Sequence, residues 1–374
     1  MLIGVDASRA VRAQRTGTER YSLELIRHLL ALNGRHHWRL YCLSLPESGL
    51  FIANQLVSWR VLRMPRLWTH LGLSWEMLTR PPDVLFVPAH VLPLWRPARS
   101  VATVHDLGYR RYPEAHPWRQ RLYLAWSTWW NARMATRVLV DSRATRDDLI
   151  AAYDITPDRI IVVYPGRDET ITRVDDPVRW AAVRARYGIG PHYVLYVGTL
   201  QPRKNLIRLI QAFARLCARH RDIPSDLELV LAGKVGWLSD AILTEPQRLG
   251  IECRIRFPGY VDEADLPTLI SGALVYAYPS LYEGFGFPVL EAQACGVPVL
   301  TSMGSSLPEV AGEAAWLVDP TDVDAIADGL YRLLTDKELR ARLVACGYRN
   351  VLRFSWDQAA RQVLSVLEDV GESG

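Results

Sequence analysis

The chain has 374 residues, 49% of them hydrophobic and 22% charged, and its formal net charge is +4 at pH 7. This composition is typical of a soluble globular protein with two or three domains of ordinary size. No apolar run approaches the roughly 18 residues of a membrane span, which excludes a membrane-spanning protein.

Cysteine usage and the first residues indicate the compartment. The five cysteines are scattered and odd in number, without C-x-x-C or metal spacing, so they are predicted to be reduced core residues. The start, MLIGVDASRA, passes directly into an apolar strand without a basic segment, so no signal peptide is expected. The sequence therefore predicts a cytoplasmic protein.

Apolar strand-like runs alternate with helical patterns along the whole chain, which predicts an α/β protein with parallel sheets. The strands expected before a polar break at residues 166–177 are Leu2–Asp6, Trp38–Leu43, Val57–Arg63, Val84–Val87, Val101–Val104, Val138–Asp141 and Ile160–Val163. Those expected after it are Tyr193–Val197, Leu227–Ala232, Ile255–Phe257, Leu274–Tyr278, Val297–Thr301 and Ala315–Val318. Helices are expected at Glu19–Leu32, Arg143–Tyr153, Leu206–Arg219 and Ala325–Leu334. The pattern predicts two doubly wound domains with a cleft at their carboxyl strand ends.

Charge and tryptophan are unevenly distributed. Residues 1–175 carry a net charge of about +8 and the remainder about −4. Arginine and tryptophan are concentrated together in the segment Tyr109–Arg133. This combination suits a surface that faces anionic lipid headgroups, so peripheral membrane contact is one interpretation. The alternative is an amphipathic helix with tryptophan in the core and arginine in water.

Two motifs in the first half have the residues of a ligand site. Gly17, in Thr16-Gly17-Thr18, opens a helix and could let backbone N–H groups approach a phosphate; alternatively Thr18 is only an N-cap. His105 follows a strand and could bind a sugar hydroxyl or shuttle a proton. Asp106 would then orient the ring or cap the next turn. A histidine that is satisfied locally is the simpler alternative.

In the second half, Gly198 and Thr199 end a strand, and Arg203 and Lys204 stand at the start of the next helix. Cations at a strand-to-helix turn could neutralise a diphosphate, with arginine as a fork and lysine as a point charge. Lysine occurs at three positions in the whole chain, so its presence beside Arg203 favours a function over an ordinary solvated charge pair.

The run EGFGFPVLE, from Glu283 to Glu291, follows the strand that ends at Tyr278 and leads into a helix. The glycines allow a ligand close to the backbone, and the helix N-terminus offers N–H groups to an anion. Carboxylates accept hydrogen bonds from sugar and ribose hydroxyls. The motif therefore predicts a nucleotide-sugar pocket, although two glutamates at this spacing also occur by chance.

Other signals are discounted. Asp322 and Asp324 resemble a metal-binding D-x-D, but they directly precede a helix, where acidic residues act as caps. The strand Leu2–Asp6 is not followed by G-x-G-x-x-G, so a dinucleotide site is not indicated. No metal and no nucleic-acid partner are expected.

Together these motifs resemble the retaining glycosyltransferases of family 4, which have the GT-B fold of two Rossmann-like domains facing across a cleft. The residues of this chain that carry the resemblance are Tyr196-Val197-Gly198-Thr199, Pro202-Arg203-Lys204-Asn205, the run EGFGFPVLEAQACGVPV from Glu283, and Ser306-Leu307-Pro308-Glu309-Val310. The family usually has an additional glycine in the N-terminal loop, where this chain has Thr16-Gly17-Thr18.

The resemblance implies an acceptor-side domain at residues 1–170, a nucleotide-sugar-binding domain at 178–355, and a C-terminal helix at 356–374 that crosses back to the first domain. It also implies roles for individual residues. Arg203 and Lys204 would bind the donor diphosphate, Glu291 the ribose hydroxyls, and His105 the sugar. The transferred sugar would be held by Glu283 and by the backbone of Gly284, Phe285, Gly286 and Phe287. Gly17, Gly198 and Thr199 complete the expected donor contacts.

The expected reaction is transfer of a sugar, with retention at the anomeric carbon, from a nucleoside-diphosphate sugar to an acceptor hydroxyl. GDP-mannose is the favoured donor because the PRKNL context resembles mannosyltransferases; UDP-sugars remain open. The basic, tryptophan-rich first half suits a polyprenyl-diphosphate-linked or other glycan acceptor at a membrane face. The alternatives are a nucleotide-sugar epimerase or phosphorylase with the same fold, or a catalytically silent binding partner in polysaccharide assembly.

Overall fold

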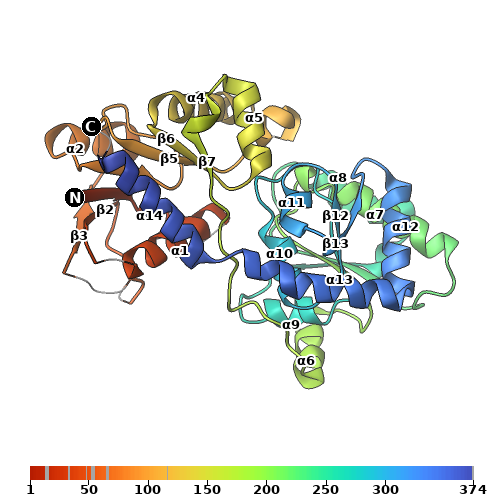
Figure 1. The fold of residues 1–374 in the computed structure, drawn as a ribbon. Coiled ribbons are helices and arrows are strands. Elements are labelled where there is room, and N and C mark those ends of the chain that lie inside the picture. The colour runs from red at the N-terminus through yellow and green to blue at the C-terminus, as the bar shows by residue number, and fades with distance from the viewer. Residues whose placement is uncertain are drawn as a thin grey trace. The chain divides into compact units, whose positions relative to one another are not determined.

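The computed structural model describes residues 1–12, 17–32, 34–47, 49–51, 55–64, 67–115 and 117–372. Contacts within the chain divide it into two compact units. Unit 1 contains Met1–Gly166 and Phe354–Gly374, and unit 2 contains Arg167–Arg353. Each unit is a parallel β-sheet with helices packed around it (Figure 1). The predicted α/β class with two doubly wound domains is confirmed.

Unit 1 is built on a seven-stranded sheet with the order β3-β2-β1-β4-β5-β6-β7 and parallel pairing throughout. The chain starts in the middle of the sheet and adds strands to both sides, which is the doubly wound arrangement. The strands are β1 (Leu2–Asp6), β2 (His37–Cys42), β3 (Val57–Val61), β4 (Val84–Val87), β5 (Ser100–Val104), β6 (Arg137–Val140) and β7 (Ile160–Val162).

The helices of unit 1 include the last helix of the chain, α14, which packs against α1 and β4. Figure 1 shows α14 in blue beside the red α1, so two segments far apart in sequence share one unit. The helical elements are α1 (Gly17–Ala31), η1 (Trp68–Leu73), α2 (Ser74–Thr79), α3 (Gly108–Arg111), η2 (Pro113–Ala115), α4 (Trp118–Met134), α5 (Arg143–Tyr153), η3 (Pro157–Arg159) and α14 (Trp356–Glu372).

Unit 2 has a six-stranded parallel sheet with the order β10-β9-β8-β11-β12-β13. Its strands are β8 (Tyr193–Val197), β9 (Glu228–Ala232), β10 (Ile255–Gly259), β11 (Val275–Tyr278), β12 (Val299–Ser302) and β13 (Ala315–Val318). Its helical elements are α6 (Pro177–Tyr187), η4 (Pro202–Lys204), α7 (Leu206–Arg219), α8 (Asp240–Leu249), η5 (Glu252–Arg254), α9 (Leu266–Ser271), α10 (Phe287–Ala294), α11 (Leu307–Ala311), α12 (Val323–Thr335), α13 (Lys337–Asn350) and η6 (Val351–Arg353).

Each unit has its own hydrophobic core. In unit 2, the apolar strands and helix α7 contribute fully buried residues such as Tyr196, Phe213 and Tyr276. In unit 1, a separate cluster includes Leu85, Val140 and Leu149. Strands buried on both faces read as continuous apolar runs, which is why all the predicted strands are found with ends shifted by about two residues at most.

Candidate functional site

A tight turn after β8 places the two candidate cations of unit 2. Arg203 and Lys204 form the short helix η4, and Asn205 then adopts a left-handed conformation with φ of 62°. The Asn205 side chain donates hydrogen bonds to the carbonyls of Pro279 (3.1 Å) and Pro320 (2.6 Å). Asparagine tolerates this conformation better than most residues, and its side chain fixes the turn beside the end of β11.

Lys204, Arg203 and Glu283 form one ionic cluster at the carboxyl ends of β8 and β11. The Lys204 ammonium donates to Glu283 Oε1 at 2.6 Å and to the Tyr278 hydroxyl at 2.6 Å. The Arg203 guanidinium donates to Glu283 Oε2 at 3.2 Å and to the Tyr282 carbonyl at 2.6 Å. The structure therefore brings together three residues that the sequence singled out in two separate motifs, and it adds Tyr278.

The electrostatics of this cluster are set by burial and by its two cations. Burial alone raises the pKa of the Glu283 carboxyl, but Lys204 and then Arg203 outweigh burial and lower the pKa to about 2. Glu283 is therefore ionised at neutral pH. Two cations face one carboxylate, which gives the cluster an excess of one positive charge. Such a site can bind an anion such as a diphosphate.

Two glycines adopt positive φ angles in the loops that precede and follow the residues of this cluster. Gly198 follows β8 with φ of 152°, and a Cβ there would lie 2.6 Å from the Tyr196 hydroxyl. Gly286 has φ of 130°, and a Cβ there would lie 2.9 Å from Leu307. Any other residue would be strained at either position. Thr199 lies between Gly198 and η4, and its carbonyl accepts a hydrogen bond from Tyr196.

The loop Glu283–Gly286 leads into α10, as its Gly-rich sequence predicted. The Ser306 hydroxyl donates to the Glu283 carbonyl at 2.9 Å, and the Glu283 N–H donates to Ser305 Oγ at 3.0 Å. Gly284 and Phe285 are buried in this loop, whereas Phe287 starts the helix and is half-buried. Glu291 lies half-buried in the second turn of α10. Ser305 and Ser306 thus hold the loop beside the ionic cluster.

In unit 1, His105 directly follows β5 and contacts residues from two neighbouring strands. Its Nδ1 lies 2.6 Å from Asp141 Oδ2, and its Nε2 lies 3.1 Å from the Pro88 carbonyl oxygen. Asp106 instead accepts the N–H of Gly108 at 2.8 Å. Of the two roles considered for Asp106, the structure shows capping of the next turn, and the residue that orients His105 is Asp141.

Two further features of unit 1 bear on the sequence interpretation. Helix α1 begins at Gly17, so Thr18 lies inside the helix and is not its N-cap; Thr16 lies outside the described residues. Asp6, which sequence reasoning did not select, ends β1 as a buried carboxyl, and burial raises its pKa to about 6. The sequence signal that could have identified Asp6 is its position at the carboxyl end of the strand β1.

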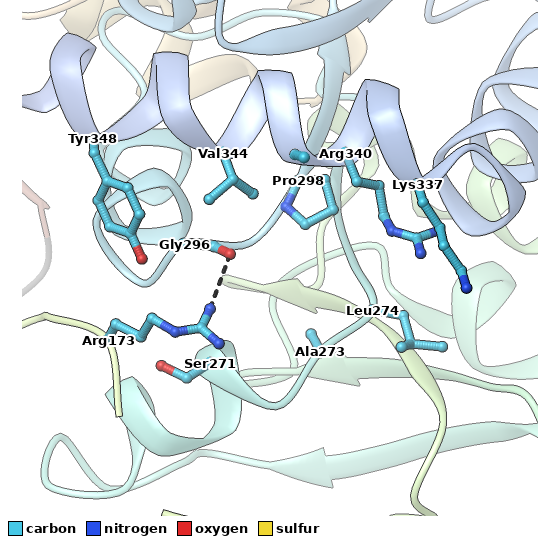
Figure 2. Close-up of a pocket in the computed structure, with 11 residues that line it drawn as sticks. Arg173, Ser271, Ala273, Leu274, Gly296, Pro298, Lys337, Arg340, Val344 and Tyr348 are labelled. Atoms are coloured by element: carbon cyan, nitrogen blue, oxygen red, sulfur yellow. Dashed lines mark hydrogen bonds between the residues drawn. The ribbon is translucent and has the colours of Figure 1, made fainter. Parts of the chain in front are cut away.

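A cavity in unit 2 lies at the amino ends of β11 and β12, away from the ionic cluster. Its volume is about 560 Å³, and Figure 2 shows Arg173, Arg340 and Lys337 among its lining residues. Arg173 donates to the Gly296 carbonyl just after α10 (3.2 Å), and Arg340 donates to the Leu334 carbonyl in the last turn of α12 (2.6 Å). Cations commonly satisfy the carbonyls of helix C-termini, so capping explains these two arginines.

The structure explains the discounted D-x-D motif. Asp322 caps α12 by accepting the N–H groups of Asp324 (2.8 Å) and Ala325 (3.0 Å), and Asp324 pairs with Arg215 and Arg219. Within the part of the chain that the structure describes, no helix is long and apolar enough to cross a membrane.

Comparison with known proteins gives the family. Residues 15–170 match the family model Glycosyltransferase Family 4, and residues 183–350 match the model Glycosyl transferases group 1. The chain is 31% identical over 377 residues to the O-antigen chain mannosyltransferase B of Escherichia coli, which covers 96% of this chain and 97% of that protein.

Solved structures with the same fold include the sucrose-phosphate synthase of Thermosynechococcus elongatus, with a TM-score of 0.76 at 20% identity and full coverage of both chains. HepE of Anabaena, solved with UDP and glucose, has a TM-score of 0.74 at 19% identity and covers 98% of this chain and 99% of its own. These likenesses confirm the expected GT-B fold. On the family models and the full-length relative, the chain belongs to the family 4 glycosyltransferases and is a glycosyltransferase.

Proposed function

We propose that this enzyme transfers mannose from GDP-mannose to a hydroxyl of a glycan acceptor in polysaccharide or lipopolysaccharide synthesis. The choice of mannose is supported by the full-length relative, which is named as an O-antigen mannosyltransferase. The main support for the proposed donor site is the cluster of Arg203, Lys204 and Glu283, which has an excess of positive charge.

In the proposed reaction, Arg203 and Lys204 bind the diphosphate and stabilise the charge that develops as it departs. Glu291 accepts hydrogen bonds from the ribose hydroxyls. Glu283 and the backbone from Gly284 to Phe287 orient the sugar, and His105 is assigned a contact with the sugar. Because side-chain cations supply the charge neutralisation, the proposal includes no metal.

The chemistry is proposed as a front-face displacement with retention. The bond from the anomeric carbon to the diphosphate oxygen breaks, and a bond from that carbon to the acceptor oxygen forms on the same face. The acceptor's proton passes to the departing phosphate oxygen. No protein nucleophile is needed, so Glu283 is assigned to positioning and stabilisation.

The acceptor is proposed to be lipid-linked, and helix α4 supports this. Trp118, Leu122, Trp126 and Trp129 recur at helical spacing, and all four are exposed, between 36% and 60%. The alternative of a helix with its tryptophans in the core therefore does not describe these residues. Arg119 stacks on Trp118 at 5.2 Å. Aromatic rings with adjacent arginines suit the interface of an anionic membrane.

Calorimetric titration tests the donor site. The protein is titrated with GDP-mannose, UDP-glucose, UDP-N-acetylglucosamine and ADP-glucose in the presence of EDTA. We expect tight binding of GDP-mannose and its loss in Lys204→Ala and Glu291→Ala. The matched controls are Lys337→Ala and Glu252→Ala, which change the same residue types at exposed positions of unit 2. Binding of none of the four donors by folded protein would overturn the proposed donor site.

The stereochemistry needs a product measurement. With GDP-mannose and a lipid-linked or oligosaccharide acceptor, proton NMR of the first-formed product reports the anomeric configuration. An α-linked mannoside from the α-linked donor supports retention, and a β-linked product would exclude it. Activity that disappears with EDTA and returns with Mg²⁺ would exclude the metal-independent form of the proposal.

A further inference from the structure

The two ring nitrogens of His105 both face hydrogen-bond acceptors of the protein. Nδ1 lies 2.6 Å from the carboxylate of Asp141, which follows β6, and Nε2 lies 3.1 Å from the main-chain carbonyl of Pro88, which follows β4. A carbonyl oxygen can only accept, so Nε2 must carry a hydrogen. An ionised carboxylate also only accepts, so Nδ1 carries one as well. With Asp141 ionised, this arrangement is that of the imidazolium form.

The groups around the ring favour that form. Burial lowers the pKa of His105, but the charge and hydrogen bond of Asp141, and then Asp106, raise it above its ordinary value. Tyr21 from α1 meets the ring edge-on at 4.7 Å between centroids. His90, from the loop after β4, does not compete for the proton, because burial, Arg9 and Arg12 lower its pKa to about 4.

Asp141 is well suited to hold a cation. It is 4% exposed, and its second oxygen, Oδ1, has no hydrogen-bond partner among the described residues. A buried carboxylate with one unpaired oxygen is costly unless a positive charge lies beside it. His105 supplies this charge, and the 2.6 Å contact is a short, charge-assisted hydrogen bond.

We propose that Asp141 is a positioning residue that holds His105 as a cationic hydrogen-bond donor during sugar transfer, so that His105 is not a general base. The inference rests on the proposed contact between His105 and the sugar. The Nε2–H group donates a hydrogen bond to the Pro88 carbonyl in this structure. In the proposal, the same N–H group donates a hydrogen bond to a substrate oxygen. Burial raises the pKa of Asp141, and the charge and hydrogen bond of His105 oppose this rise. With Asp141 ionised, neither ring nitrogen is a free acceptor, which a proton shuttle requires.

The alternative explanation is that Asp141 and His105 only stabilise the fold. The variant Asp141→Asn distinguishes the two explanations, because asparagine keeps the shape of the side chain and its amide can donate a hydrogen bond to Nδ1. The ring then becomes neutral with its hydrogen on Nε2, and the Pro88 contact survives. A purely structural pair would lose stability in this variant without a change in the chemistry of the reaction.

Nitrogen-15 NMR of histidine-labelled protein gives a readout that needs no donor or acceptor. The His105 signals are identified by their absence in His105→Gln. We expect both nitrogens of wild-type His105 to show protonated shifts at pH 7.5, and Nδ1 to show an unprotonated shift in Asp141→Asn. The matched control is Asp106→Asn, which should leave the Nδ1 proton in place. An unprotonated nitrogen in the wild type would overturn the proposal, even if Asp141→Asn failed to fold.

Kinetics supply the second test. In Asp141→Asn we expect kcat to fall by about 10²-fold, the size of the effect when one preorganised donor is lost, with KM for the donor much less changed. As pH rises, kcat of the wild type should persist until His105 loses its proton, and in Asp141→Asn it should fall at lower pH. If the donor proves not to be GDP-mannose, the NMR result still stands. An unchanged kcat and pH profile beside the expected NMR shifts would overturn the role in transfer.

Discussion

Lys204 and Glu283 form an ion pair in which each side chain is about 10% exposed. Removing one partner of such a pair leaves the other charge uncompensated, at a cost of about 3–5 kcal/mol. We expect Lys204→Met to lower the free energy of unfolding by about 3 kcal/mol, near the lower limit because Arg203 still faces Glu283. Adding Glu283→Gln should restore part of this loss, which urea unfolding of the two single variants and the double variant would measure. Strictly additive losses would mean that the pair is not coupled.

The same carboxyl makes stability depend on pH. The pKa of Glu283 is lowered from 4.5 to about 2 in the folded chain, so its stabilisation is fully present above pH 4.5 and is lost as pH falls toward 2. This lowering of the pKa corresponds to about 3 kcal/mol. In urea unfolding between pH 5 and pH 3, we expect the advantage of the wild type over Glu283→Gln to fall by about half, because the folded-state pKa is about 2. A difference that is independent of pH in this range would contradict the assigned ionisation.

At the scale of elements, helix α4 leaves several large apolar residues exposed, among them Trp118 and Trp129, while Trp130 and Met134 pack against the core. Its buried positions are the small or polar residues Ser127, Thr128, Asn131 and Ala132. Removing one tryptophan from a membrane interface costs about 1.5 kcal/mol, or about tenfold in affinity. We therefore expect Trp118→Ala and Trp129→Ala each to weaken binding to vesicles that contain anionic phospholipid by about tenfold.

The control for this measurement is Trp237→Ala, which removes a tryptophan of comparable exposure (42%) from unit 2. Vesicle sedimentation at low and at high salt separates the two contributions. Salt should weaken binding through the arginines, whereas the tryptophan effect should persist. Equal binding by Trp118→Ala, Trp129→Ala and the wild type would remove α4 as the contact surface.

The sequence predicted the elements well because their signals are local. Leu2–Asp6, Val84–Val87, Tyr193–Val197 and Ala315–Val318 are strands with the predicted ends, since each is a short apolar run bounded by polar or turn residues. Local patterns carry no information about exposure of a mixed helix, so the orientation of Trp118 and Trp129 on α4 stayed open.

The sites were predicted in part for the same reason. Arg203, Lys204 and Glu283 stand in recognisable motifs, and strand ends of one parallel sheet meet at one edge, so their meeting could be anticipated. Asp141 lies 36 residues from His105, and only the pairing of β5 with β6 makes it the neighbour. Asp106, adjacent in sequence, points its carboxylate into the next turn. Selecting between the two required the three-dimensional structure.

At the scale of the whole molecule, two units with separate cores should respond differently to a nucleotide. Unit 1 contains ten of the 13 tryptophans, so tryptophan fluorescence reports mainly on its unfolding, whereas calorimetry reports on both units.

The proposed diphosphate site lies in unit 2. A ligand at 100 times its Kd stabilises the unit that binds it by about 2.7 kcal/mol, and each kcal/mol shifts Tm by about 2–4 °C for a domain of this size. With saturating GDP, we expect a calorimetric transition to rise by about 5–10 °C while the fluorescence transition stays in place. Lys204→Ala should abolish the shift, and Lys337→Ala should retain it. Equal shifts by both methods would show that the units unfold together or that GDP stabilises both.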